Sequence, residues 1–207
     1  IGFPSVKESK IDIPGADGYL DMTDYFGTRY EDRKITIECD IEDRSYYDWA
    51  GRMSQLSNYL HGKKRKIVLD WDNGFYYLGR GTCEYEKKNR AFSLVTLKFE
   101  CDPYKYELTA TDEDWLWDPF DFEEGVIKEY GNQNVDGTLV LTVIGSPMPV
   151  VPRITVSSDM QVEFEGERFD LKAGENYLPD IEIKDGEHVM TFTGHGIVTV
   201  SYRGGSL

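Results

Sequence analysis

Cysteine and histidine are scarce in this chain, which limits the chemistry that it can carry. Its 207 residues include three of each. The cysteines, Cys39, Cys83 and Cys101, are odd in number and lack Cys-x-x-Cys spacing, so neither a disulfide framework nor a zinc site is predicted. Each falls in an expected strand. We therefore predict small buried side chains in a protein made in a reducing cytoplasm.

Long hydrophobic runs are also absent. No apolar stretch approaches the roughly 20 residues of a membrane helix, and no signal-peptide pattern stands at the N-terminus. Hydrophobic residues still make up 40% of the chain and aromatic residues 14%, which favours folded cores over wholesale disorder. The length suits one large domain or two ordinary ones.

Basic residues are few in the second half. Residues 1–106 hold 17 Lys and Arg against 18 Asp and Glu, whereas residues 107–207 hold 6 against 20. Such a step indicates two units with different surroundings. A surface this acidic repels nucleic-acid phosphates, so DNA binding by the second half is not expected. Solubility alone would also explain the acidity.

The first half begins with a loop rich in turn residues. Pro14-Gly15 and Asp17-Gly18 stand where unusual backbone φ values are expected. Residues 35–41 then alternate apolar and polar side chains, which predicts a half-buried strand. Residues 45–62 follow as the one clear helix, with Ser45 as N-cap, an apolar stripe, and Gly62 as the terminating glycine. The stripe comprises Trp49, Met53, Leu56 and Leu60.

A hairpin is expected next. Asn73-Gly74 predicts a type I′ turn between strands at 67–71 and 75–78. Further strands are predicted near 82–86 and over 92–101. The first unit is thus expected to be α+β, with antiparallel strands and one helix.

The segment 109–124 marks the expected boundary. It mixes seven carboxylates with aromatic residues, which we expect to dock on one domain while the carboxylates stay in water. Beyond it, short strands at regular spacing predict a β-sandwich. Those strands are 138–144, 153–157, 161–165, 168–171, 182–184, 189–193 and 197–202, with tight turns at Glu165-Gly166, Asp185-Gly186 and Gly194-His195-Gly196.

The predicted class is therefore mainly β. An N-terminal domain covers residues 1–108, a linker 109–124, and a C-terminal sandwich 125–207.

No catalytic constellation is evident. His61, at a helix end where an imidazolium suits the dipole, His188 and His195 have no convincing nucleophile as partner. Asp112–Asp114 lack the spacing of a calcium loop, and 38 acids make any chosen pair of carboxylates uninformative. We predict no catalytic, cofactor-binding or metal-binding residue, and no enzyme.

The opening of the chain resembles the distal tail proteins of long-tailed bacteriophages and their prophages. There, a PG-x-DG-x-x-D loop precedes a Tyr and an Arg-Lys-Ile-Thr strand, and this chain has Tyr30 and the strand start 33–36 in that order. Two later features are also similar to this family. One is the helix that runs into a strand with a Tyr-rich partner strand, and the other is the closing segment 101–108. The resemblance covers most of residues 10–108 and is weaker in the second half, where PRITVS and the last residues match.

This resemblance implies a structural virion protein without a cofactor. Six copies would form a ring at the end of the tail tube, with N-terminal domains in the ring and galectin-like sandwiches outside it. The implied partners are further copies of the chain, the tail tube protein, and tail tip, baseplate or receptor-binding proteins. No specific nucleic-acid binding and no membrane insertion are expected. The protein would be made in the bacterial host cytoplasm and reside in the virion tail. The candidate assembly loop is Pro14, Gly15, Asp17 and Gly18.

A second hypothesis is a carbohydrate-binding β-sandwich module for attachment to the host surface. Such a module would stack an aromatic ring on the sugar beside polar side chains. No tryptophan follows residue 125, so Tyr130, Tyr177 and Tyr202 are the candidates. Ordinary packing of each tyrosine is the alternative.

Overall fold

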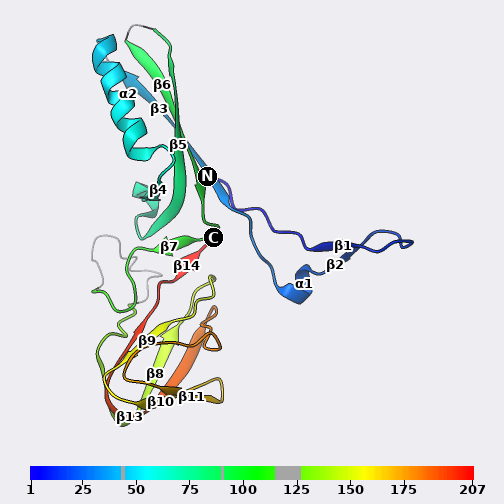
Figure 1. Ribbon diagram of the computed structural model, residues 1–207, viewed down its shortest axis with the longest axis vertical. Helices are drawn as coiled ribbons and strands as arrows, with labels where there is room; N and C mark the ends of the chain where they lie inside the picture. Colours follow the sequence, from blue (N-terminus) through cyan, green and yellow to red (C-terminus); the bar gives the residue numbers. More distant parts are fainter. Residues whose placement is uncertain (43–44, 90, 115–126) are drawn as a thin grey trace. The chain divides into compact units, whose positions relative to one another are not determined.

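The computed structural model describes residues 1–42, 45–89, 91–114 and 127–207. Strands dominate the described chain, which confirms the mainly β class (Figure 1). Among these residues, no helix has the length and apolar content that crossing a membrane requires. The contacts divide the chain into two compact units, Ile1–Ile67 with Tyr77–Tyr104 and Val68–Tyr76 with Lys105–Leu207.

The first unit contains an antiparallel sheet in the order β5–β6–β3. The strands are β3 (Arg33–Glu42), β6 (Phe92–Cys101) and β5 (Phe75–Lys87), whose first two residues belong to the second unit. β4 (Lys64–Ile67) pairs with the other edge of β5. The prediction for 92–101 is confirmed residue by residue, whereas the two strands predicted within 75–86 are one continuous strand.

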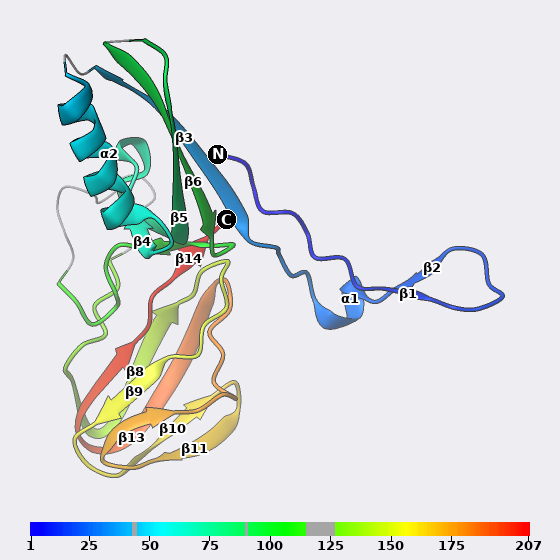
Figure 2. The ribbon, with the colours of Figure 1, turned by 45° about the horizontal axis from the view of Figure 1, so that its top comes forward.

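Helix α2 (Tyr46–Leu60) covers one face of this sheet (Figure 2). Its stripe is buried at Trp49, Met53 and Leu60, as the periodicity predicts. The Trp49 ring meets Tyr85 of β5 edge-on, with 5.5 Å between ring centroids. Close approach of the helix depends on Gly81, because a Cβ there would lie 2.8 Å from Leu60 Cγ.

The predicted ends of the helix are confirmed in position. Ser45 is the N-cap in an extended conformation, although its side chain makes no capping hydrogen bond. Gly62 follows the last turn with a φ of +73°, the left-handed conformation that glycine adopts without strain.

Cys39 is exposed, so the prediction that it is buried is wrong. The cause is its place on β3, the edge strand of the sheet, which pairs with β6 on one side. Burial falls along β3 from Ile35, which is fully buried, to the exposed Cys39. Cys83 and Cys101 are buried as predicted.

The turn at Asn73-Gly74 is not type I′. That turn needs a positive φ at both positions, but Asn73 has a φ of −73° and follows the short 3₁₀ helix η1 (Asp70–Asp72). β4 ends at Ile67, which pairs with Tyr77. Phe75 and Tyr76 instead pair with β7 (Lys105–Glu107) in the second unit, and this competing pairing replaces the tight hairpin.

The second unit is built on one six-stranded sheet that curls around a single core. The order is β11–β10–β13–β9–β12, with β8 on the other side of β13. The short strand β14 (Gly205–Ser206) pairs separately with β7. The six strands are β8 (Gln133–Ile144), β9 (Arg153–Val156), β10 (Met160–Phe164), β11 (Glu167–Leu171), β12 (Gly174–Tyr177) and β13 (Glu187–Ser201).

β13 joins the two parts of this sheet. It pairs with β10 as far as Thr193 and with β9 from Val198 onward, while β8 runs beside it from Glu187 to Val198. The predicted tight turn at Gly194-His195-Gly196 is therefore wrong, because these residues lie within one long strand. Gly194 and Gly196 have φ values of +151° and +141°, and side chains there would collide with residues 157–160. The glycines thus mark the place where β13 exchanges partners.

Two other predictions in this unit have opposite outcomes. Glu165 and Gly166, with φ values of +50° and +84°, form the predicted tight turn between β10 and β11. The strand predicted at 182–184 is reduced to an isolated bridge between Ile183 and Val150. β12 was not predicted, because Gly-Glu-Asn has little strand propensity.

Replacing Gly194 by Ala tests the role of the bend in β13. The added Cβ would lie 2.7 Å from Met160 Cβ. Strain at positive φ and overpacking should together lower the free energy of unfolding by about 2–4 kcal/mol. Urea unfolding followed by circular dichroism measures the change. Gly51→Ala, in open space on α2, is the control and should stabilise by about 0.5–1 kcal/mol. Equal stability of Gly194→Ala and the wild type would contradict the account.

Candidate functional site

The predicted assembly loop lies at the tip of an exposed β-hairpin. β1 (Lys10–Asp12) and β2 (Tyr19–Asp21) pair antiparallel and form a two-stranded sheet of their own (Figure 1). The structure brings Pro14, Gly15, Asp17 and Gly18 together between them, and all four are exposed.

The sequence of the loop explains its shape. The Ala16 amide donates to the Ile13 carbonyl at 3.1 Å, which closes a four-residue turn. Pro14 holds the second position and Gly15, with a φ of +85°, the third, as a type II turn requires. Gly18 has a φ of +78° where the chain enters β2.

Backbone contacts continue from the hairpin to its base. The Lys7 amide donates to the Arg29 carbonyl at 2.7 Å, and the Glu31 amide donates to the Ser5 carbonyl at 2.8 Å. Nearer the hairpin, the Met22 amide donates to the Ser9 carbonyl at 2.8 Å. Residues 5–31 thus form a ribbon of two paired segments of the same chain. This ribbon, called the arm below, includes the short helix α1 (Thr23–Phe26).

Local charge contacts shape the arm without burying it. The Asp21 carboxylate accepts a hydrogen bond from the Thr23 amide at 2.9 Å. Hydrogen bonding to Thr23 lowers the pKa of Asp21. Lys10 pairs with Glu8 at 2.8 Å, and both side chains are exposed, so the pair contributes little to stability.

The arm carries large apolar side chains that remain exposed. Tyr19 is 70% exposed, and Ile11, Ile13 and Leu20 are each more than two-fifths exposed. Grouped apolar surface on a short hairpin is typical of a contact surface for another molecule. The strand propensity of three-residue β1 and β2 is too weak a signal to have predicted this hairpin.

The three histidines have separate partners. His61 accepts a hydrogen bond from the Cys83 amide through Nδ1 at 3.3 Å. On β13, His188 faces Glu165 at 3.3 Å and His195 faces Asp136 at 3.0 Å.

The Cys83 thiol beside His61 is not an activated nucleophile. Burial raises the pKa of this thiol. A raised pKa reduces the thiolate fraction on which reactivity depends. Burial of the Cys83 side chain and the hydrogen bond from its backbone amide to His61 account for the closeness of these two residues.

Two described carboxylates of the predicted linker, Asp112 and Glu113, make structural contacts. Ser201 donates to Asp112 at 2.7 Å. Glu113 accepts from the Ala110 amide at 2.8 Å and from Arg203 at 3.0 Å. Across the described ranges, no group of three or more His, Cys, Asp or Glu could hold a metal ion. The aromatic residues of this segment, Trp115, Trp117, Phe120 and Phe122, lie outside the described residues.

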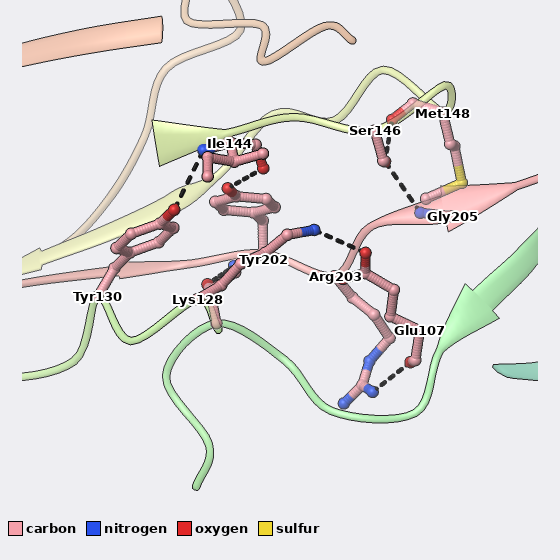
Figure 3. A network of polar contacts seen from close by, with 10 residues as sticks. Glu107, Lys128, Tyr130, Ile144, Ser146, Met148, Tyr202, Arg203 and Gly205 are labelled. Carbon is pink, nitrogen blue, oxygen red and sulfur yellow. Dashed lines mark hydrogen bonds and ion pairs between the residues drawn. The ribbon is translucent and has the colours of Figure 1, made fainter. Parts of the chain in front are cut away.

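Two of the three candidate sugar-binding tyrosines are core residues. Tyr130 and Tyr202 are buried and stacked, with 6.1 Å between ring centroids. The Tyr130 hydroxyl accepts from the Ile144 amide at 3.1 Å, and the Tyr202 hydroxyl donates to the Ile144 carbonyl at 2.7 Å (Figure 3). Burial raises the pKa of both phenols. Tyr177, by contrast, is 61% exposed on β12.

A polar network that the sequence did not predict fixes the chain segments around these tyrosines (Figure 3). Lys128 and Glu107 form an ion pair at 2.6 Å, with side chains 11% and 25% exposed. Arg203 donates to the Glu107 carbonyl at 2.7 Å and also to the Leu108 carbonyl. These contacts join residues that are far apart in sequence, which is why no local pattern indicated them.

Comparison with known proteins agrees with this fold. Residues 1–101 match the family model of the phage tail protein RIFT-related domain. The first half of the chain is thus similar to a phage tail domain. Comparison with curated proteins finds no matching sequence.

A crystal structure also matches the chain. It is that of SPP1 Dit, described as a paradigm of the hub adsorption apparatus in phages that infect Gram-positive bacteria. The TM-score is 0.58 at 15% identity, and the match covers 100% of this chain and 90% of that chain. The fold is thus shared across both units, beyond the phage tail domain itself. The resemblance to distal tail proteins is confirmed.

The Tyr202→Phe variant tests the tyrosine pair in the second unit. It leaves the part-buried Ile144 carbonyl without its hydroxyl donor and should lower the free energy of unfolding by about 1–3 kcal/mol. Chemical denaturation of the variant and the wild type gives this difference. Tyr177→Phe, at an exposed position, should change stability by less than about 0.5 kcal/mol. Similar losses in both variants would exclude a specific role for the Tyr202 hydroxyl.

Alkaline pH should also weaken the second unit. A tyrosine in the unfolded chain ionises near pH 10, while burial keeps Tyr130 and Tyr202 protonated to higher pH. Their stabilisation is complete below about pH 10 and is lost as pH rises toward their folded-state pKa values. Unfolding measured between pH 8 and 11 should show this fall, with a shallower slope in Tyr202→Phe. Identical slopes would show that Tyr202 does not contribute.

Proposed function

We propose that this chain is a distal tail protein, a structural hub that joins the tail tube of a siphophage or prophage to its tip or baseplate. The observation that carries the proposal is a phage tail domain in the first half combined with a fold shared with SPP1 Dit over the whole chain. The role is assembly, without catalysis or a bound cofactor, and the place of action is the virion tail after synthesis in the host cytoplasm.

The two halves would have different tasks. Residues 1–108 would form the ring of six copies, and the sandwich at 125–207 would lie outside it. Residues 109–124 would connect these two domains. The charge distribution supports this division, since the near-neutral first half can pack against copies of itself while the acidic second half repels its neighbours. A closed ring also satisfies the exposed edge of β3, which an isolated copy leaves open.

The arm supplies a contact between copies in this proposal. Its apolar side chains, led by Tyr19, need a partner surface that would bury them. The loop of Pro14, Gly15, Asp17 and Gly18 sets the shape of the tip. The remaining partners are the tail tube protein and tip, baseplate or receptor-binding proteins.

Shortening the arm tests this assignment. Replacing residues 13–18 with Asn-Gly preserves the pairing of Asp12 with Tyr19 and supplies a type I′ turn. Because the removed residues are all exposed, thermal unfolding should stay unchanged. Native mass spectrometry of the full chain should show six-copy assemblies in the wild type and at least a tenfold loss of them in the variant.

The matched control is Glu165→Asn, which places Asn-Gly at a tight turn of the second unit. It should assemble like the wild type. Full assembly of the shortened-arm variant would contradict the role of the loop. Unfolding of its first unit would show that the loop is internal structure.

A further inference from the structure

His188 lies between two hydrogen-bond acceptors in the second unit. It stands near the start of β13, and its side chain is 12% exposed. The imidazole packs on the buried ring of Phe164, with 5.7 Å between ring centroids. Its Nδ1 lies 3.3 Å from the Glu165 carboxylate, and its Nε2 lies 3.0 Å from the Lys184 carbonyl. The ring therefore bridges the β10–β11 turn and the loop that precedes β13.

The doubly protonated form of His188 suits both contacts at once. A carboxylate and a carbonyl both accept, so each ring nitrogen must carry a hydrogen to interact favourably. A neutral imidazole has one N–H and turns the lone pair of its other nitrogen toward an oxygen. With the hydrogen at Nε2, the Nδ1 lone pair would face the Glu165 carboxylate. The imidazolium removes this repulsion and adds a charge attraction.

The surroundings of His188 hold a surplus of negative charge. Residues 163–168 and 182–187, which contain the turn and the loop, include six acidic residues against two basic ones. Both basic residues face acids of these segments, since Arg168 donates to Glu163 at 2.8 Å and Lys184 lies 3.7 Å from Glu182. The other charged residues there are Glu165, Glu167, Asp185 and Glu187. A positive charge on His188 therefore reduces a net repulsion.

The turn that His188 contacts is strained and has space beside it. Glu165 has a φ of +50°, a conformation that costs a non-glycine residue energy. A groove of about 360 Å³ lies along His188, Glu165 and Glu187. The Glu165 side chain is 61% exposed, so it can leave His188 for water without unfolding the sheet.

We propose that His188 is a proton-operated clasp of the second unit. In the protonated state, it joins Glu165 to the Lys184 carbonyl and closes the turn against the loop. When the imidazolium gives its Nδ1 proton to water, Glu165 loses its partner and the turn opens beside the groove. The inference rests on contacts within the second unit, so it stands or fails independently of ring assembly.

The direction of the pH effect follows from proton binding. A histidine of the unfolded chain loses its proton near pH 6.5. Above that pH the folded clasp holds a proton that the unfolded chain has released, so stability falls as pH rises. The stabilisation is thus complete at mildly acidic pH and declines through neutral pH.

Urea unfolding of the full chain, followed by circular dichroism between about pH 5.5 and 8, tests the clasp. Over this range, the unfolding equilibrium constant of the wild type should rise at least about threefold more than that of His188→Gln. Glu165→Gln should show the same weakened dependence, because its amide can donate to a neutral imidazole. NMR supplies a local measurement: the Gly166 amide signal should titrate together with the His188 ring signals in the wild type and stay constant in Glu165→Gln.

His195→Gln is the matched control. His195 lies on the same strand with Nδ1 3.0 Å from Asp136, but the two side chains are 78% and 85% exposed. Water screens such a pair, so this variant should keep the wild-type pH dependence. An unchanged pH dependence in both His188→Gln and Glu165→Gln would overturn the proposal, as would a Gly166 signal that is constant in the wild type. Should His188→Gln fail to fold, Glu165→Gln and the Gly166 signal decide.

Discussion

Backbone pairing along β13 is the constraint on which the second unit depends. This one strand pairs with β8 on one side and with β10 and then β9 on the other. The exchange of partners at Gly194–Gly196 lets a single sheet curl around one core. It also fixes the register of β9, and through β9 that of β12.

In the first unit, burial is incomplete in a way that favours assembly. Helix α2 packs against β5, but the burial of side chains declines along the edge strand β3 toward Cys39. The arm exposes Tyr19 and its apolar neighbours in the same unit. A lone copy leaves this surface and this edge in water, whereas the proposed closed ring would give both a partner. The proposed hub function follows from that imbalance together with the phage tail domain.

Local patterns in the sequence predicted much of the secondary structure. The stripe of α2, the alternation of β3 and β6, and the turn at Glu165-Gly166 were all found, because each depends on neighbours in the chain. The failures have tertiary causes. Asn73-Gly74 does not form the predicted tight turn, because Phe75 and Tyr76 pair with β7 instead. Gly194 is a strand residue, because β8 continues to pair with β13 at this position.

The candidate site was predicted in part. The glycines of Pro14-Gly15 and Asp17-Gly18 adopt the positive φ values that their dipeptides indicate. Sequence alone did not show that the loop lies at the tip of an exposed hairpin. It also did not show that Tyr130 and Tyr202 are core residues while Tyr177 is exposed. Such distinctions depend on which face of a strand is covered, and alternation in one strand cannot decide that.

The most direct test of the central claim is electron microscopy of the purified chain. The account predicts closed rings with sixfold symmetry in the class averages, with the acidic second units outside the ring. Particles that remain single copies at every concentration, or open filaments in place of rings, would contradict it.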